Sequence, residues 1–113
     1  QLHLGDQAVL AVECNNAGTQ IWAVLGRWSA QGREQTMVLM NETGRVLKQK
    51  QLNPWTLQPG TQLLVDPVRQ QLLMCVSESS DSNIAMAALM NANTLEWSEF
   101  SRISIKEAVW LMP

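Results

Sequence analysis

The sequence predicts an all-β protein made of two antiparallel sheets of hairpins. Its apolar residues occur in short runs, and several runs alternate with polar residues as in a strand that buries one face. Clusters of Asn, Asp, Gly and Pro separate these runs and are typical of turns. One pattern, an apolar run followed by a short polar turn and a second apolar run, occurs three times. Together these observations favour a β-sandwich or a barrel-like closure of the hairpins.

Four strands are expected in the first half of the chain, at residues 7–14, 20–28, 35–40 and 45–52. The first strand alternates, and one of its faces is expected to hold Ala8, Leu10, Val12 and Cys14. The second strand is apolar on both faces, which predicts a central position, and Gly26 within it indicates a bulge or a close approach of the backbone. Residues 29–34 are expected to form a loop, and residues 41–44 the turn of a hairpin.

The second half begins with residues 53–60, whose two prolines and one glycine indicate a connector. A hairpin follows, with strands at residues 61–65 and 70–76. Asp66 and Pro67 suit the first two positions of the type I turn between these strands.

The remaining elements are also expected to be strands. Residues 84–90 are ambiguous, because Ala and Met favour a helix, but the short length and the flanking turns favour a strand. Residues 95–103 alternate, which would place Trp97 and Phe100 on opposite faces. Residues 103–112 predict a last strand, with a short helix as the alternative.

The length of 113 residues predicts a single β domain, residues 1–113. A chain of this length can bury a core without disulfides or metals. Within the domain, residues 5–52 and 61–103 are expected to form two sub-units that the connector at residues 53–60 joins.

The turn-forming residues Asn41, Asp66 and Asn91 follow one another at intervals of 25 residues. A shift of 50 residues aligns parts of the first half with the second, and it places Trp22 on Leu72. The alternatives are an internal duplication and the generic spacing of hairpins.

The stretch LLVDPVRQQLLMCVSESSDSNIAMAALMNANT, residues 63–94, resembles one blade of a β-propeller of the NHL or YVTN kind. The residues that match are Val65, Asp66, Leu72 to Val76, Asn83, Ile84 and Asn91 to Thr94. Residues 20–52 resemble a second, poorer blade, so the resemblance covers most of Gln20 to Ile103.

The resemblance implies an architecture that this chain cannot complete alone, because a propeller needs about four to eight blades. The chain has room for two. The alternatives are a piece of a larger propeller, copies that assemble to close one, and two sheets that pack face to face.

The composition excludes several functions. The net charge is −2 and the basic residues are scattered, so no surface for nucleic acid or anionic lipid is expected. No apolar run approaches the ~20 residues of a membrane-spanning helix. The single histidine, His3, lies near the terminus, and no catalytic motif occurs. Residues 78–83 lack the acidic spacing of a calcium loop. We therefore expect no enzyme activity, no catalytic residue, no metal and no cofactor.

Cys14 and Cys75 are the two cysteines, and their spacing excludes a CxxC motif. Each lies in an apolar run, where a free thiol is typically buried, and one disulfide between them is the alternative. The first residue, Gln1, suits either a cleaved secretory signal or an excised domain. A disulfide would favour a periplasmic or secreted location.

Five tryptophans are the most informative feature of the composition. Those in strands are expected in the core. The candidate partner-binding residues are Trp55 and Leu57 in the connector and Trp110 near the C-terminus. The predicted function is a non-enzymatic domain that binds another protein, as an inhibitor, an immunity factor or an assembly subunit does. The alternative is a fragment or subunit of a larger β-repeat assembly, completed by other chains or domains, in which self-association is expected.

Overall fold

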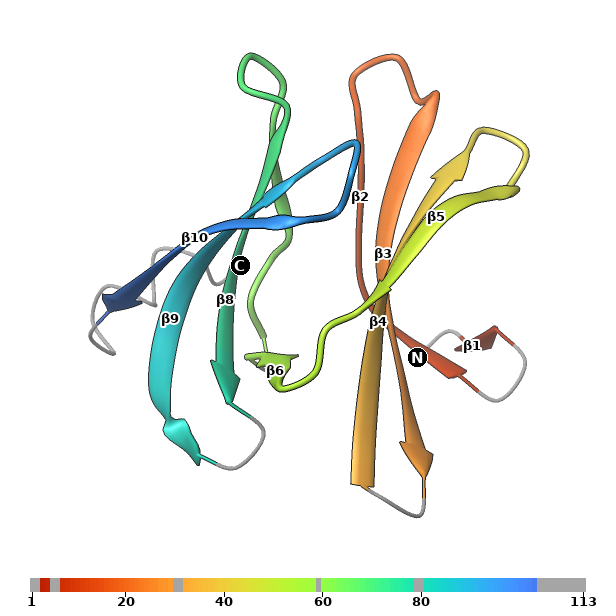
Figure 1. Ribbon diagram of the computed structural model, residues 1–113. Coiled ribbons are helices and arrows are strands. Elements are labelled where there is room, and N and C mark those ends of the chain that lie inside the picture. Colours follow the sequence, from red (N-terminus) through yellow and green to blue (C-terminus); the bar gives the residue numbers. More distant parts are fainter. Residues whose placement is uncertain (1–2, 5–6, 30–31, 59, 79–80, 104–113) are drawn as a thin grey trace. The chain divides into compact units, whose positions relative to one another are not determined.

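The computed structural model describes residues 3–4, 7–29, 32–58, 60–78 and 81–103. These residues form ten β-strands and no helix (Figure 1). The strands are β1 (His3–Leu4), β2 (Gln7–Cys14), β3 (Gln20–Ser29), β4 (Gly32–Asn41), β5 (Val46–Gln51), β6 (Trp55–Leu57), β7 (Leu64–Asp66), β8 (Gln71–Glu78), β9 (Asp81–Asn91) and β10 (Trp97–Ile103). The prediction of an all-β protein is confirmed.

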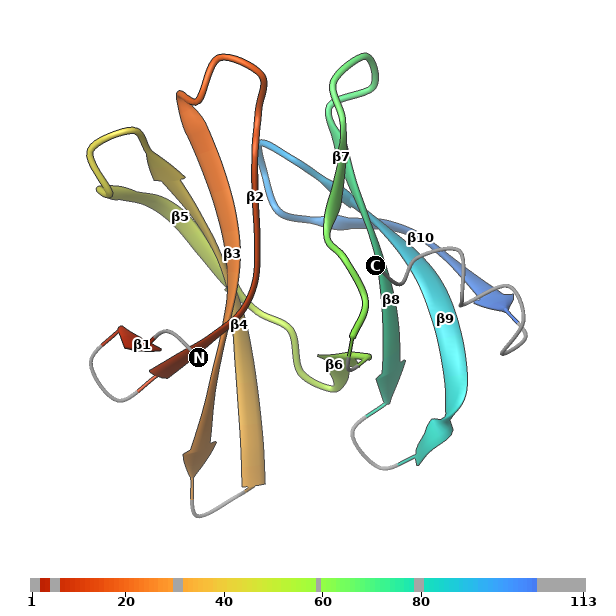
Figure 2. The ribbon, with the colours of Figure 1, turned by 180° about the vertical axis from the view of Figure 1, so that it is seen from behind.

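The chain divides into two compact units, Gln1–Leu52 and Asn53–Pro113, and each holds one antiparallel sheet. The first sheet has the strand order β1-β2-β3-β4-β5. The second has the order β10-β9-β8-β6, and β6 and β7 pair with opposite ends of β8 (Figure 2). The expected pair of antiparallel sheets is confirmed. Both sheets are open among the described strands, so the barrel-like alternative is not observed.

In the first sheet, β3 and β4 pair continuously from Gln20 opposite Asn41 to Ser29 opposite Gly32. The loop that the sequence predicts at residues 29–34 is therefore too long. The ends of β3 and β4 are polar, and Arg27 forms an ion pair with Glu34 directly opposite it. Polar residues of this kind stabilise paired strands, but in a single sequence they are indistinguishable from the residues of a loop.

β2 does not alternate as the sequence predicts. Its pairing with β3 shifts register between Val9 and Ala11, which leaves Leu10 as the extra residue of a bulge. Val9 and Val12 consequently lie on the same face of the sheet, although they are three residues apart.

Gly26 of β3 explains where this bulge lies. A Cβ atom added at Gly26 would come within 2.8 Å of Cδ1 of Leu10. The absence of a side chain on Gly26 therefore provides the room that the Leu10 side chain occupies. The sequence indicates a bulge or a close approach of the backbone at Gly26; the structure instead places the bulge in the neighbouring strand β2 and a leucine side chain against Gly26.

The register gives the first sheet two faces that differ in burial. The buried residues of its closed face are Trp22, Val24, Gln35, Met37 and Leu39. On its open face, a buried cluster of Ala23, Leu25 and Val38 packs against the half-buried side chains of Val9 and Met40. Ile21, Val12 and Cys14 share this open face, because each pairs in register with it.

The second sheet has the same division. Its closed face contains Leu72, Met74, Val76, Ala88 and Met90, all of them completely buried. Its open face has buried Cys75 surrounded by the half-buried side chains of Leu64, Leu73 and Ala85. Residues 84–90 belong to β9, so the choice of strand over helix is confirmed.

β10 repeats the irregularity of β2. Its register shifts between Trp97 and Glu99, and the rings of Trp97 and Phe100 lie 4.9 Å apart between centroids. The prediction that these two rings lie on opposite faces is therefore wrong. Trp55 of β6 also stacks on Phe100, at 4.7 Å, so three aromatic rings pack together within the second unit.

The three turns spaced by 25 residues share one hydrogen-bonding pattern. Each begins with a side-chain oxygen that accepts hydrogen bonds from backbone N–H groups of the turn. The donors are Thr43 and Arg45 for Asn41, Val68 and Arg69 for Asp66, and Asn93 and Thr94 for Asn91.

The two units repeat one strand plan, in which β3-β4-β5 corresponds to β8-β9-β10. Asn41 and Asn91 end the equivalent strands β4 and β9, and they pair with Gln20 and Gln71. The shift is thus 50 residues between β4 and β9 but 51 between β3 and β8. With β4 and β9 aligned at their Asn residues, Trp22 corresponds to Leu73. With β3 and β8 aligned at a shift of 50 residues, Trp22 corresponds to Leu72, as the sequence indicates, and both side chains are completely buried.

Candidate functional site

The open face of the first sheet presents apolar side chains that are only partly covered. Val12 is 61% exposed, and Val9, Ile21 and Met40 are half-buried. Val9 and Met40 pack against the buried cluster of this face. A partly exposed apolar surface beside a buried cluster is typical of a site that another macromolecule covers.

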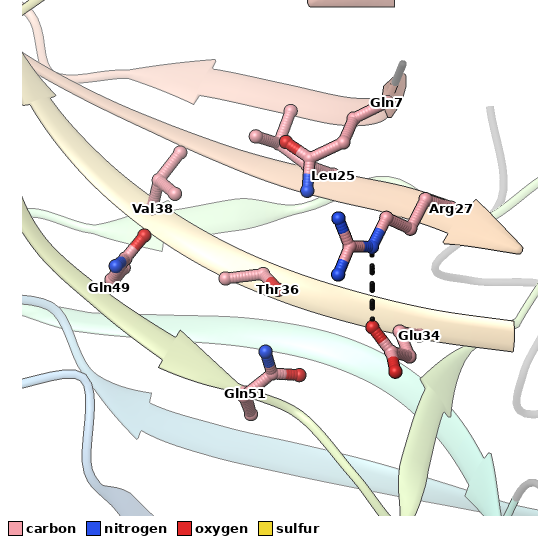
Figure 3. Close-up of a pocket in the computed structure, with 8 residues that line it drawn as sticks. All are labelled: Gln7, Leu25, Arg27, Glu34, Thr36, Val38, Gln49 and Gln51. Carbon is pink, nitrogen blue, oxygen red and sulfur yellow. Dashed lines mark hydrogen bonds and ion pairs between the residues drawn. The ribbon is translucent and has the colours of Figure 1, made fainter. Parts of the chain in front are cut away.

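A hollow with a volume of about 390 Å³ lies at one end of this face (Figure 3). Its lining residues come from β2, β3, β4 and β5 and are Gln7, Leu25, Arg27, Glu34, Thr36, Val38, Gln49 and Gln51. Leu25 and Val38 are its buried apolar residues. Across it, Nε of Arg27 donates to Oε2 of Glu34 at 3.4 Å.

The polar groups of the hollow favour a neutral ligand. The Arg27–Glu34 ion pair has no net charge. Gln7, Gln49 and Gln51 add side-chain amides, each of which offers donors and an acceptor. Such a set can bind amides or hydroxyls, including the main chain of a partner, and it has no excess charge for an ion.

β5 forms one edge of the first sheet, and no described strand pairs with its outer side. All its residues are exposed except Lys50, which is half-buried. The side chains of Lys48 and Lys50 lie on one face, whereas those of Gln49 and Gln51 lie on the open face beside the hollow. An edge of this kind leaves backbone N–H and C=O groups available for another strand.

Each sheet has one face that is less buried than the other. On the open face of the first sheet, Ile21 and Met40 are half-buried beside the buried cluster of Ala23, Leu25 and Val38. On the open face of the second sheet, Leu73 and Leu89 are half-buried beside buried Cys75.

The predicted partner-binding residues do not gather into one described surface. Trp55 is half-buried, lies in β6 rather than in an irregular connector, and stacks on Phe100. Leu57 is 8% exposed. Trp110 lies outside the described residues. A partner-binding role for these three residues stays a prediction.

Both cysteines are free thiols, so the disulfide that the sequence leaves open is not formed. Cys14 is exposed on the open face of the first sheet. Cys75 is completely buried, as expected for a free thiol in an apolar strand, and this burial raises the pKa of its thiol.

The described residues contain no group of three or more His, Cys, Asp or Glu side chains that could hold a metal ion. Across the same part of the chain, no helix has the length and apolar character that crossing a membrane requires. In comparisons with known proteins, no protein-family model, curated protein or solved structure matches the chain.

Sequence reasoning did not identify the hollow or the free edge of β5. Residues of the hollow such as Gln7 and Gln51 are far apart in the chain and are brought together only by the register of four strands. The sequence did contain an indication that β5 is an edge strand, because a run of alternating Lys and Gln is typical of a solvated edge strand.

Proposed function

We propose that the chain is a pair of β-repeat units within a larger β-repeat assembly, which further units from other chains or domains complete. The half-buried apolar side chains that remain on one face of each sheet support this function most directly. A repeat unit needs both faces apolar when it has a neighbour on each side, and one such face remains partly exposed in each unit.

The strand plan supports the same proposal. β2-β3-β4-β5 is a four-stranded antiparallel meander. The strands β8-β9-β10 correspond to β3-β4-β5, and the two short strands β6 and β7, which both pair with β8, together take the place of β2. A four-stranded meander is the unit of a β-propeller blade, and a propeller needs about four to eight of them. The resemblance of the sequence to propeller blades agrees with this plan.

When the chain is studied alone in solution, we propose that a unit of a second copy of the chain covers the open face of the first sheet. Cys14 tests this because its thiol is exposed on that face. We expect alkylation of Cys14 to be fast in dilute solution and about tenfold slower at high protein concentration, since an added unit would cover the thiol. Alkylation of Cys14 at the same rate at every concentration would contradict the proposal.

A second candidate function is a non-enzymatic domain that binds another protein. The specific observation that favours it is the free edge of β5 beside the neutral hollow. This function does not require the faces of the sheets to be covered by further units.

A further inference from the structure

We propose that the outer edge of β5 binds an extended acidic segment of a partner protein as an added β-strand. This inference rests on the protein-binding candidate and is independent of the covering of the sheet faces. The first observation is the free edge itself, because β5 ends the strand order and has exposed side chains. Main-chain hydrogen bonds to such an edge supply affinity, and alternate side chains supply specificity.

The charges of β5 indicate the chemistry of the added strand. Lys48 and Lys50 lie on one face of the edge, two residues apart, and no described acidic residue forms an ion pair with either. Residues that lie directly opposite each other on neighbouring strands share a face, and opposite charges there stabilise the pair. A strand with acidic residues at alternate positions would therefore place its carboxylates beside both ammonium groups.

The other face of β5 suits polar residues between the acidic ones. Gln49 and Gln51 project on that face, and both also line the neutral hollow. Their amides can both donate to and accept from the hydroxyl or amide side chains of an added strand. The expected ligand thus alternates carboxylates with small polar residues.

The same lysines disfavour a second copy of this chain at the edge. If two β5 strands paired antiparallel about a two-fold axis normal to the sheet, residues of the same face would lie opposite each other. Lys48 and Lys50 would then lie opposite or next to their own counterparts, and like charges in these positions are destabilising. Lysine on an edge strand is a known means of preventing such self-pairing.

The test uses fluorescence anisotropy with a labelled peptide of about six residues, a common strand length, in which glutamate alternates with threonine. We expect saturable binding to the full chain. Methylation of the peptide N–H groups on one edge should weaken binding about tenfold or more, because it removes the main-chain hydrogen bonds and keeps the charge. The double substitution Lys48→Gln with Lys50→Gln should weaken binding by a similar factor, because it removes the complementary charge.

Arg69→Gln is the matched control, since Arg69 is an exposed cation in a turn of the second unit. It should leave peptide binding unchanged. The proposal is overturned if the peptide does not bind, if the methylated peptide binds equally well, or if an oligonucleotide of the same charge competes equally. None of these results would change the concentration dependence of Cys14 alkylation, so failure of this inference is distinguishable from failure of the repeat assembly.

Discussion

At the residue scale, the two cysteines occupy opposite environments although their sequence contexts are alike. Each lies in an apolar strand, yet Cys14 is exposed and Cys75 is completely buried. The difference depends on which face of which sheet each thiol occupies, and hence on register. Sequence pattern predicted that both residues lie in strands and that a free thiol there is buried, which is confirmed for Cys75 and wrong for Cys14.

The raised pKa of Cys75 predicts how stability depends on pH. Burial raises the pKa of this thiol from its usual value of 9.0, so at high pH the unfolded chain releases the proton more readily than the folded chain does. The contribution of this thiol to the free energy of unfolding should therefore stay constant below about pH 9 and decrease as the pH rises further.

Urea denaturation of the wild type and of Cys75→Ala measures this effect. The variant should be less stable than the wild type at about pH 7, and the difference should shrink above about pH 9. Cys14→Ala is the control, because it removes the exposed thiol and keeps the buried one. A difference between Cys75→Ala and the wild type that stays constant with pH would contradict the account.

At the element scale, alternation predicted strands well and faces less well. β2 begins and ends where the sequence predicts, but the extra residue Leu10 moves Val12 to the face of Val9. β10 differs in the same way at Trp97. A single inserted residue inverts every later side chain of a strand, and a period-two pattern cannot locate such an insertion. Gly26 was the one local signal of a bulge.

The contact between Gly26 and Leu10 gives a prediction for this element. Gly26→Ala would place a Cβ within 2.8 Å of Cδ1 of Leu10, so the leucine must move, and we expect a loss of about 1–3 kcal/mol in the free energy of unfolding. With Leu10→Ala in the same chain, the added methyl group has room. The two substitutions together should cost about 1 kcal/mol less than the sum of their separate costs.

Thermal or urea denaturation of the two single variants and the double variant measures this coupling. Strictly additive effects would show that the Leu10 side chain does not occupy the space beside Gly26.

At the scale of the whole molecule, the regular spacing of the turns was the most useful prediction. Asn41, Asp66 and Asn91 each begin a turn, and the side chain of each accepts hydrogen bonds from backbone N–H groups of its turn. The assignment of faces was beyond the sequence, because a register shift such as the one at Leu10 changes which side chains share a face. The proposed repeat assembly depends on these faces, since it requires the half-buried apolar side chains of each open face to be covered.

The most direct test of the repeat assembly is the molar mass of the chain in solution, measured by light scattering after size exclusion. Val12→Asp places a charge on the open face at a side chain that is 61% exposed, so it should not unfold the protein. Val68→Asp is the matched control, because Val68 is 89% exposed in the turn between β7 and β8 and is not part of the open face of the first sheet. We predict that the wild type and Val68→Asp exceed the monomer mass of 12.6 kDa at high concentration, whereas Val12→Asp stays at 12.6 kDa. A wild-type mass of 12.6 kDa at every concentration, equal to that of Val12→Asp, would contradict the account.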